Sequence, residues 1–156
     1  MNGPTLKALR SLLFFTMDEA AIFVGGGVSL RSWQYWEAGN RPVPPDVAES
    51  VGELAQWRVK AVAAANASVA QALSELPDDA NVDPIRLVSY ASVEDWMTLP
   101  GREPVLWKPN CSVIAEICAR HHAQIIVFDG PAYSKWLAGR HDDESMRGQW
   151  AAETLQ

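Results

Sequence analysis

Apolar side chains recur at intervals of three or four residues through most of the first half of the chain, which is the spacing of one face of an α-helix. Segments with this spacing cover residues 5–14, a stretch that begins at Thr16, and residues 29–38. A longer, alanine-rich segment extends from residue 45 or 46 to about residue 76. Prolines and glycines separate these segments, so the pattern predicts a bundle of short helices followed by one long helix.

The segment at residues 29–38 has two unlike faces. Its apolar stripe contains Leu30, Trp33 and Trp36 or Glu37. Its other face contains Arg31, Ser32, Gln34 and Tyr35. Ser29 is a suitable N-cap, and Gly39 is a suitable residue to follow the last turn. The sequence therefore predicts a short helix that aromatic side chains anchor on one side and that presents hydrogen-bonding groups on the other.

Beyond residue 76 the apolar pattern changes to shorter runs. Two prolines, three aspartates and an asparagine at residues 77–84 predict a linker. Strands are predicted at 85–91 and 124–128, and helices at 93–99, from residue 110 or 112 to 122, and at 131–137. We expect residues 103–109 to be extended or irregular, and the chain from Gly139 onward to be a loose polar tail.

These elements predict a fold that is mainly α with a small α+β C-terminal part. Residues 1–76 would form a helical unit that includes the long helix, residues 85–138 a small α+β unit, and residues 139–156 the tail. The two strands can pair in parallel through a right-handed crossover. Because a two-stranded sheet is only marginally stable, pairing across a dimer would extend it.

The alanine-rich part of the long helix leaves two packing partners open. Val62, Val69 and Leu76 recur every seven residues within a stripe of small side chains. Such a stripe suits close packing against another helix, which can belong to a partner subunit or to the C-terminal half of the same chain.

Composition limits the class of protein. With 48% hydrophobic and 21% charged residues, the 156-residue chain is composed like a globular protein and is long enough for one domain or two small ones. No apolar run approaches the ~18 residues that a membrane span needs, and the N-terminus lacks a signal-peptide pattern, so we expect a cytoplasmic protein without membrane contact. Cys111 and Cys118 do not make a disulfide framework.

The net charge of −6 argues by itself against binding to nucleic acid. The charge is unevenly distributed, however. Residues 1–44 carry four basic and three acidic side chains, a net charge of +1, whereas the rest of the chain carries nine basic and sixteen acidic side chains, a net charge of −7. The acidity therefore lies outside the first helices. The few basic residues there predict few phosphate contacts per subunit, so two subunits would be needed for useful affinity.

The polar face of the segment at 29–38 is typical of a helix that reads base edges in a DNA major groove. Arg31 can bond guanine through two donors, and Gln34 can pair with adenine. Tyr35 and Ser29 suit contacts to phosphate. The candidate DNA-binding residues are Ser29, Arg31, Ser32, Gln34, Tyr35, Asn40 and Arg41. The alternative for the helix face is a merely solvated surface, and for Asn40 and Arg41 it is a helix stop followed by a solubilising charge.

Other side chains that could bind a metal or act in catalysis favour structural roles. The segment that includes Cys111, Cys118, His121 and His122 lacks the close ligand spacing of structural zinc sites. Asp129 follows a predicted strand without any partner motif, and a turn explains it. No phosphate-binding loop, nucleotide fingerprint or nucleophile elbow occurs. We therefore expect no enzyme activity, no metal and no cofactor.

Several stretches together resemble the lambda-repressor-like helix-turn-helix domain. They are residues 6–10 (LKALR), 16–21 (TMDEAA), 24–25 (VG), 36–41 (WEAGNR) and Pro44. More narrowly, residues 31–39 (RSWQYWEAG) followed by residues 43–47 (VPPDV) resemble the anti-CRISPR-associated repressors and their uncharacterised bacterial relatives. The close resemblance covers about the first 60 residues. Two features depart from the general family: the turn at residues 25–27 is about two residues longer, and Met17 replaces a glutamine that often contacts phosphate.

This resemblance implies an N-terminal helix-turn-helix bundle, a C-terminal dimerisation domain and a homodimer that represses its own operon. The helix at 29–38 would bind double-stranded DNA at an inverted repeat, with half-sites ~34 Å apart. The resemblance also implies a structural bridge between Glu37 and Arg10. Three alternatives stay open: a DNA-binding antitoxin of a toxin–antitoxin pair, a ligand sensor or small enzyme built on residues 85–138, and structured RNA as a further target.

Overall fold

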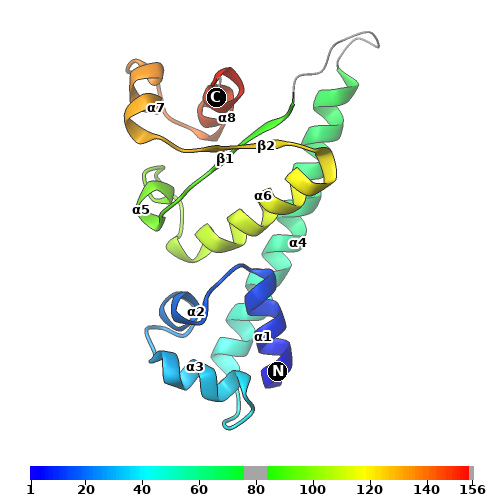
Figure 1. The fold of residues 1–156 in the computed structure, drawn as a ribbon, viewed down its shortest axis with the longest axis vertical. Coiled ribbons are helices and arrows are strands. Elements are labelled where there is room, and N and C mark those ends of the chain that lie inside the picture. The colour runs from blue at the N-terminus through cyan, green and yellow to red at the C-terminus, as the bar shows by residue number, and fades with distance from the viewer. Residues whose placement is uncertain (76–83, 155–156) are drawn as a thin grey trace.

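The computed structural model describes residues 1–75 and 84–154 (Figure 1). Its first half contains α1 (Gly3–Leu12), α2 (Met17–Phe23), α3 (Leu30–Glu37) and the long α4 (Pro45–Ser74). Its second half contains β1 (Arg86–Ser89), α5 (Val93–Trp96), the 3-10 turn η1 (Pro104–Leu106), α6 (Trp107–His121), β2 (Gln124–Val127), α7 (Gly130–Leu137) and α8 (Glu144–Glu153). The prediction of a mainly helical chain with a small sheet in its C-terminal part is confirmed.

Side-chain caps fix where the first helices begin. The Asn2 carboxamide accepts a hydrogen bond from the Thr5 backbone N–H at 2.9 Å, so α1 begins at Gly3 rather than at the predicted Thr5. Thr16 and Glu19 form the predicted reciprocal capping box at the start of α2. Ser29 caps α3, which begins and ends one residue inside the predicted range of 29–38, with Ala38 as its C-cap.

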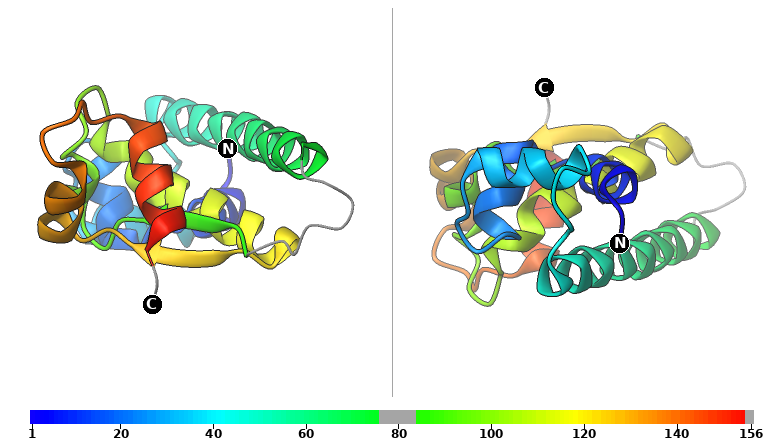
Figure 2. Two further views of the ribbon diagram at one scale, coloured as in Figure 1. Left: turned by 90° about the horizontal axis from the view of Figure 1, so that it is seen from above. Right: turned by 90° about the horizontal axis from the view of Figure 1, so that it is seen from below.

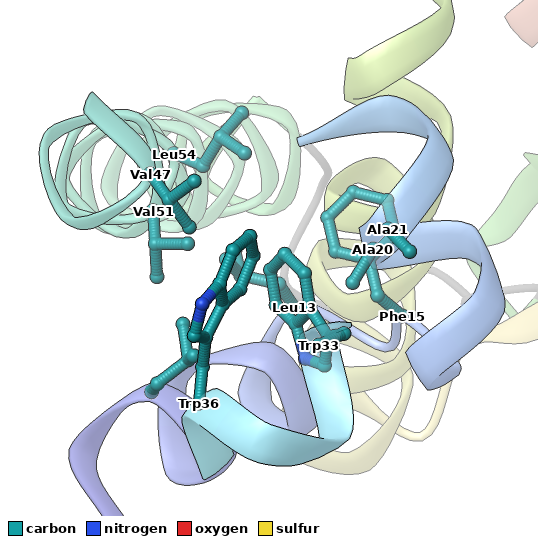
Figure 3. Close-up of a cluster of buried hydrophobic side chains, with 10 residues drawn as sticks. Leu13, Phe15, Ala20, Ala21, Trp33, Trp36, Val47, Val51 and Leu54 are labelled. Atoms are coloured by element: carbon teal, nitrogen blue, oxygen red, sulfur yellow. The ribbon is translucent and has the colours of Figure 1, made fainter. Parts of the chain in front are cut away.

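The N-terminal helices enclose one hydrophobic core (Figure 3). Trp33 and Trp36 of α3 both point into this core, as their spacing predicts, and Trp36 lies nearer to Val47 and Val51 of α4. Leu6 and Leu13 close the core from the side of α1. The prediction that Leu30 lies on the buried stripe is wrong. Leu30 is the first residue of α3, and 37% of its surface is exposed.

The sheet lies between two helical layers in the C-terminal half (Figures 1 and 2). β1 and β2 pair in parallel, with Arg86 opposite Gln124 and Ser89 opposite Val127, which confirms the predicted parallel pairing. Alternate residues then point to opposite sides. Leu87 packs with α4 and α6, whereas Val88 and Ile126 pack with residues of α7 and α8.

The long helix α4 joins the two halves. Its first turns pack on α1, and its later turns pack on α6, where Val69 contacts Val113 and Ile117. Of the two partners that the small-residue stripe left open, this structure shows the chain's own C-terminal half. The predicted linker at 77–84 lies, except for Pro84, outside the described residues. Among the described residues no helix is both long and apolar enough to span a membrane.

Two predictions for the C-terminal half are wrong. Residues 107–109 are helical, because η1 runs directly into α6 and Pro109 lies in the first turn, where a missing N–H costs no hydrogen bond. The loose tail is in fact the helix α8, which Asp143 caps and whose Trp150 and Ala151 are buried. Only a few of its side chains are apolar, and their burial depends on β1 and α7, which are distant in sequence.

Candidate nucleic-acid interface

Aromatic packing fixes α3 on the bundle. Trp33 is fully buried and Trp36 nearly so, and their rings meet edge to face at a centroid distance of 5.6 Å. The Trp33 indole N–H donates to a Glu37 carboxylate oxygen at 2.7 Å, one turn further along the helix. The buried side of α3 therefore has little freedom to rotate, and its opposite side is held toward solvent.

A buried ion pair adds a second restraint on α3. Arg10 of α1 donates to Glu37 at 2.5 Å through Nε and at 3.3 Å through Nη2. Its remaining nitrogen, Nη1, donates to the Phe15 carbonyl at 2.7 Å. The predicted bridge between Arg10 and Glu37 is confirmed. Because both charges are largely withdrawn from water, the pair depends on this full set of hydrogen bonds.

The start of α1 lies directly against the end of α3. A side-chain carbon at Gly3 would come within 2.5 Å of the carbonyl oxygens of Trp36 and Glu37, so only glycine fits at this position. Together with the ion pair, this contact sets the angle at which α3 crosses α1.

All seven candidate DNA-binding residues lie on α3 or just beyond its ends. Exposed positions are occupied by Ser29, Arg31, Gln34, Asn40 and Arg41, and half-buried positions by Ser32 and Tyr35. The hydroxyl oxygens of Ser29 and Ser32 are 3.0 Å apart. Ser29 also accepts from the Ser32 backbone N–H, so its first role is to cap the helix. The structure thus places all seven candidates on α3 or at its two ends, outside the fully buried core.

Tyr35 brings two of the arginines together. Arg31 Nε donates to the Tyr35 hydroxyl at 2.7 Å, and the Arg41 guanidinium carbon lies 4.9 Å from the centre of the Tyr35 ring. Gly39 has a φ of +75°, a conformation that favours glycine, and it turns the chain back across the end of α3. The backbone N–H groups of Asn40 and Arg41 then donate to the Tyr35 carbonyl. The sequence did not indicate this pairing of Arg41 with Tyr35.

The surface around α3 is more basic than the count of charges suggests. Of the three acidic residues in 1–44, Glu37 is neutralised by Arg10, and Glu19 is paired with Lys108 of α6 at 3.0 Å. Partial burial raises the pKa of Glu19, but hydrogen bonds from Thr16 and Lys108 outweigh it and leave the pKa below its ordinary value. Asp18 is the remaining acid, against the exposed cations Lys7, Arg31 and Arg41.

The other candidate groups have structural partners. His121 Nε2 lies 2.7 Å from the Asn66 side-chain oxygen, and Cys111 and Cys118 are half-buried on α6. Burial raises the pKa of both thiols. Within residues 1–75 and 84–154, no group of three or more His, Cys, Asp or Glu side chains is placed to hold a metal ion. Asp129 caps α7, as a strand-ending turn would.

A buried cluster in the C-terminal half was missed by sequence reasoning. Arg147 of α8 donates to Asp142 at 2.7 Å and to the Tyr90 hydroxyl at 3.4 Å. Arg102 donates to the same hydroxyl at 2.9 Å. The available signal was Asp143 as an N-cap, followed by Arg147, Trp150 and Ala151 at the three- and four-residue spacing of one helix face.

Comparisons with known proteins give this geometry its context. The model of the Aca2/YdiL-like family matches residues 1–126, which include α3 and both strands up to Ile126. This chain belongs to the Aca2/YdiL-like family. It is 32% identical to the Aca2 repressor of Pectobacterium phage ZF40 over 127 residues, which cover 81% of this chain and all of that protein. It is also 35% identical over 60 residues to the uncharacterised protein YdiL of Escherichia coli (strain K12), which is 38% of this chain and 51% of YdiL.

The family match ends before α7 and α8. These helices belong to residues 127–156, which lie beyond the matched range, yet they cover one side of the sheet. This Aca2/YdiL-like protein therefore has a layer of C-terminal structure in addition to the part that the family model describes.

Proposed function

We propose that this protein is a transcriptional regulator, a homodimeric repressor that binds an inverted repeat in double-stranded DNA through α3. The observation that carries the proposal is the exposed polar face of α3 on a helix whose other face is fixed by two buried tryptophans and an ion pair. A rigid helix with donors and acceptors on its outer face suits the reading of base edges. The name of the Aca2 repressor, a relative over its whole length, supports the same role.

Roles for the individual residues follow from their positions. Arg31 and Gln34 are exposed on the helix, where they suit base contacts, and Arg31 would exchange its hydrogen bond to Tyr35 for one to a base. Ser29 and Ser32 lie at the N-terminal end of α3, where a phosphate is favoured by the free backbone N–H groups. Tyr35, Asn40 and Arg41 lie at the other end and suit the backbone of the duplex.

The dimer is proposed to form through the C-terminal half. On β2, Ile125 is 44% exposed and Val127 is 52% exposed, although both belong to a strand. Among the described residues β2 pairs only with β1, so its other edge offers free backbone donors and acceptors. A second copy that covers this edge would bury the two side chains and place a second α3 for the other half-site.

Fluorescence anisotropy tests the proposal. The purified protein is titrated against a labelled duplex from upstream of its own gene and against a scrambled duplex of equal length, at low and at physiological salt. We expect tight binding that survives physiological salt on the native duplex only. Equal, weak binding to both duplexes that disappears at physiological salt would reduce the interaction to nonspecific attraction and end the repressor proposal.

The dimer has its own test. Sedimentation equilibrium of the wild-type protein should give twice the chain mass, and Val127→Lys should shift it toward the monomer because a buried charge is costly. Arg120→Ala, a change at an exposed position of α6, serves as the control. A wild-type monomer at the concentrations that bind DNA would contradict the dimer.

A further inference from the structure

A cleft lies between the two halves of the molecule, away from the outer face of α3. It has a volume of about 360 Å³, and its walls come from α2, α4 and η1. Pockets for small molecules typically have volumes of ~300–1,000 Å³ and combine apolar walls with a few polar groups. This cleft is large enough for a compact ligand with one or two rings.

The walls of the cleft are mostly apolar and aromatic. They include Phe23 and Val24 at the end of α2, Leu54 and Trp57 on α4, and Leu106 of η1. These side chains would cover the apolar body of a ligand, and removing that body from water supplies the main driving force for binding.

The charged groups of the cleft all have one sign. Glu53 of α4 and Glu103, which precedes η1, are both exposed and line it, and no lysine or arginine is among its lining residues. Trp57 also lines the cleft, and aromatic rings attract cations to their faces. The complementary ligand is therefore an apolar molecule that carries a positive charge, rather than an anion or a neutral hydrocarbon.

The position of the cleft connects it to α3. Phe23 is the last residue of α2 and Val24 its C-cap, and the turn that leads to α3 follows directly. The opposite wall, at η1, belongs to the C-terminal half, and Leu106 packs against the cores of both halves. A molecule in the cleft would thus contact the α2–α3 unit and the C-terminal half at once.

We propose that this cleft binds a small apolar molecule with a cationic group, and that its occupancy is coupled to the position of the α2–α3 unit. The second part rests on the proposed DNA-binding function. If the ligand changes the affinity for DNA, DNA must change the affinity for the ligand by the same factor.

Three probes that share an indole ring but differ in charge separate the effect of charge on binding from the effect of shape. Tryptamine carries an ammonium group, tryptophol a hydroxyl and indole-3-acetate a carboxylate. Isothermal titration calorimetry on the full chain should show tryptamine binding at least tenfold tighter than tryptophol, and indole-3-acetate binding weakest. Equal affinities for the three probes, or no binding of tryptamine, would overturn the cleft assignment.

Variants place the binding in the cleft. Glu53→Gln combined with Glu103→Gln should remove the preference for tryptamine, because the two carboxylates supply it. Ser50→Leu, at a half-buried position of α4 that lines the cleft, should fill the space and abolish binding. Asp46→Asn removes a carboxylate from the same helix outside the cleft and should change nothing. Retained binding in Ser50→Leu, with the far-ultraviolet circular dichroism of the wild type, would overturn the proposal.

The coupling is measured separately. Saturating tryptamine should shift the midpoint of the anisotropy titration with native DNA by at least threefold in the wild type and not in Ser50→Leu. Tryptamine binding without this shift would overturn the coupling and leave the DNA-binding function intact. If the protein binds no DNA specifically, the proposed function fails, whereas calorimetry still decides whether the cleft takes the cation.

Discussion

Each half of this protein buries an arginine in an ion pair, and the two pairs are built differently. In the N-terminal half, Arg10 of α1 holds Glu37 of α3, and only 4% of the Glu37 side chain is exposed. In the C-terminal half, Arg147 is 2% exposed, whereas its partner Asp142 is 27% exposed and lies five residues earlier in the chain. The deeply buried member is thus the carboxylate in one pair and the guanidinium in the other.

The difference separates two uses of a buried charge. The pair of Arg10 and Glu37 connects two helices and fixes the direction of α3. The Arg147 guanidinium instead fills space within an aromatic cluster, 4.6 Å from the centre of the Phe128 ring and 5.4 Å from that of Tyr133. One pair orients a helix, and the other completes a core.

The largest expected effect comes from removing the arginine that fills the C-terminal core. Arg147→Ala should lower the free energy of unfolding by about 3–5 kcal/mol, because it leaves a cavity among the aromatic rings and leaves Asp142 without its partner. Urea denaturation followed by tryptophan fluorescence measures this loss. Arg140→Ala is the matched control, since Arg140 is exposed over Trp136. A loss equal to that of the control would show that Arg147 is not part of the core.

The N-terminal pair should respond differently to replacement. Arg10→Met should cost about 3 kcal/mol, because Glu37 stays buried without a countercharge. Adding Glu37→Gln should recover most of this loss, since the amide oxygen still accepts from Trp33 and no charge remains buried. DNA affinity, measured by anisotropy, should stay reduced in the double variant, because α3 has lost its link to α1. Full recovery of both quantities would contradict an orienting role.

A smaller effect distinguishes two arginines beside Tyr35. Arg31→Ala should lower the affinity for native DNA by about 1–3 kcal/mol and relax the sequence preference, as expected for a base contact. Arg41→Ala should weaken binding to the native and the scrambled duplex alike. It should also reduce the salt dependence of the affinity by an amount that corresponds to roughly one phosphate contact. Anisotropy titrations at several salt concentrations measure both, with Arg120→Ala as the control. Identical behaviour of the two variants would remove the distinction.

Removing a helix cap from each half allows the two halves to be compared, with an expected loss of stability of about 1 kcal/mol for each. Thr16→Ala in the N-terminal half and Ser92→Ala in the C-terminal half each remove an acceptor for a free backbone N–H, and each should lower the free energy of unfolding by about 0.5–2 kcal/mol. Ser92→Ala should be the more costly, because the Ser92 hydroxyl also donates to the Asp95 carboxylate, whereas the Thr16 backbone N–H keeps its bond to Glu19 in Thr16→Ala. Urea denaturation of both variants provides the test, and a larger loss for Thr16→Ala would reverse this order.

The smallest expected effect is a dependence of the thermal stability on pH in the acidic range. The hydrogen bond from Arg147, together with that from Tyr133, holds the pKa of Asp142 below its ordinary value, although partial burial opposes this. The ionised carboxylate therefore stabilises the folded protein above the ordinary aspartate pKa of ~3.9, and this contribution is lost as the pH falls from there toward the folded pKa. The Tm of the wild type should fall toward that of Asp142→Asn as the pH is lowered from 5 to 3. A constant difference in Tm would exclude the effect.

The sequence indicated α3 well because its signals are local. Its cap, its buried tryptophans and the glycine that follows all act within a few residues of the helix. The sequence did not indicate α8, because the rings that bury Trp150 and Arg147 belong to residues distant in sequence, among them Phe128 and Tyr133. The cleft between α2, α4 and η1 was hidden for the same reason, since its walls combine side chains separated by more than half of the chain.

The placement of α8 has a consequence for synthesis on the ribosome. The fully buried side chains of the N-terminal core all precede residue 55, so most of this core can form once α4 has emerged as far as Leu54, and Val105 and Leu106 join it later. The sheet is different, because β1 emerges early, pairs with a strand about forty residues later and is covered only when residues 144–153 have followed. During elongation the nascent chain thus carries a folded α3 surface together with a strand that α8 does not yet cover. At this stage the exposed strand is most accessible to chaperones or to a neighbouring nascent copy.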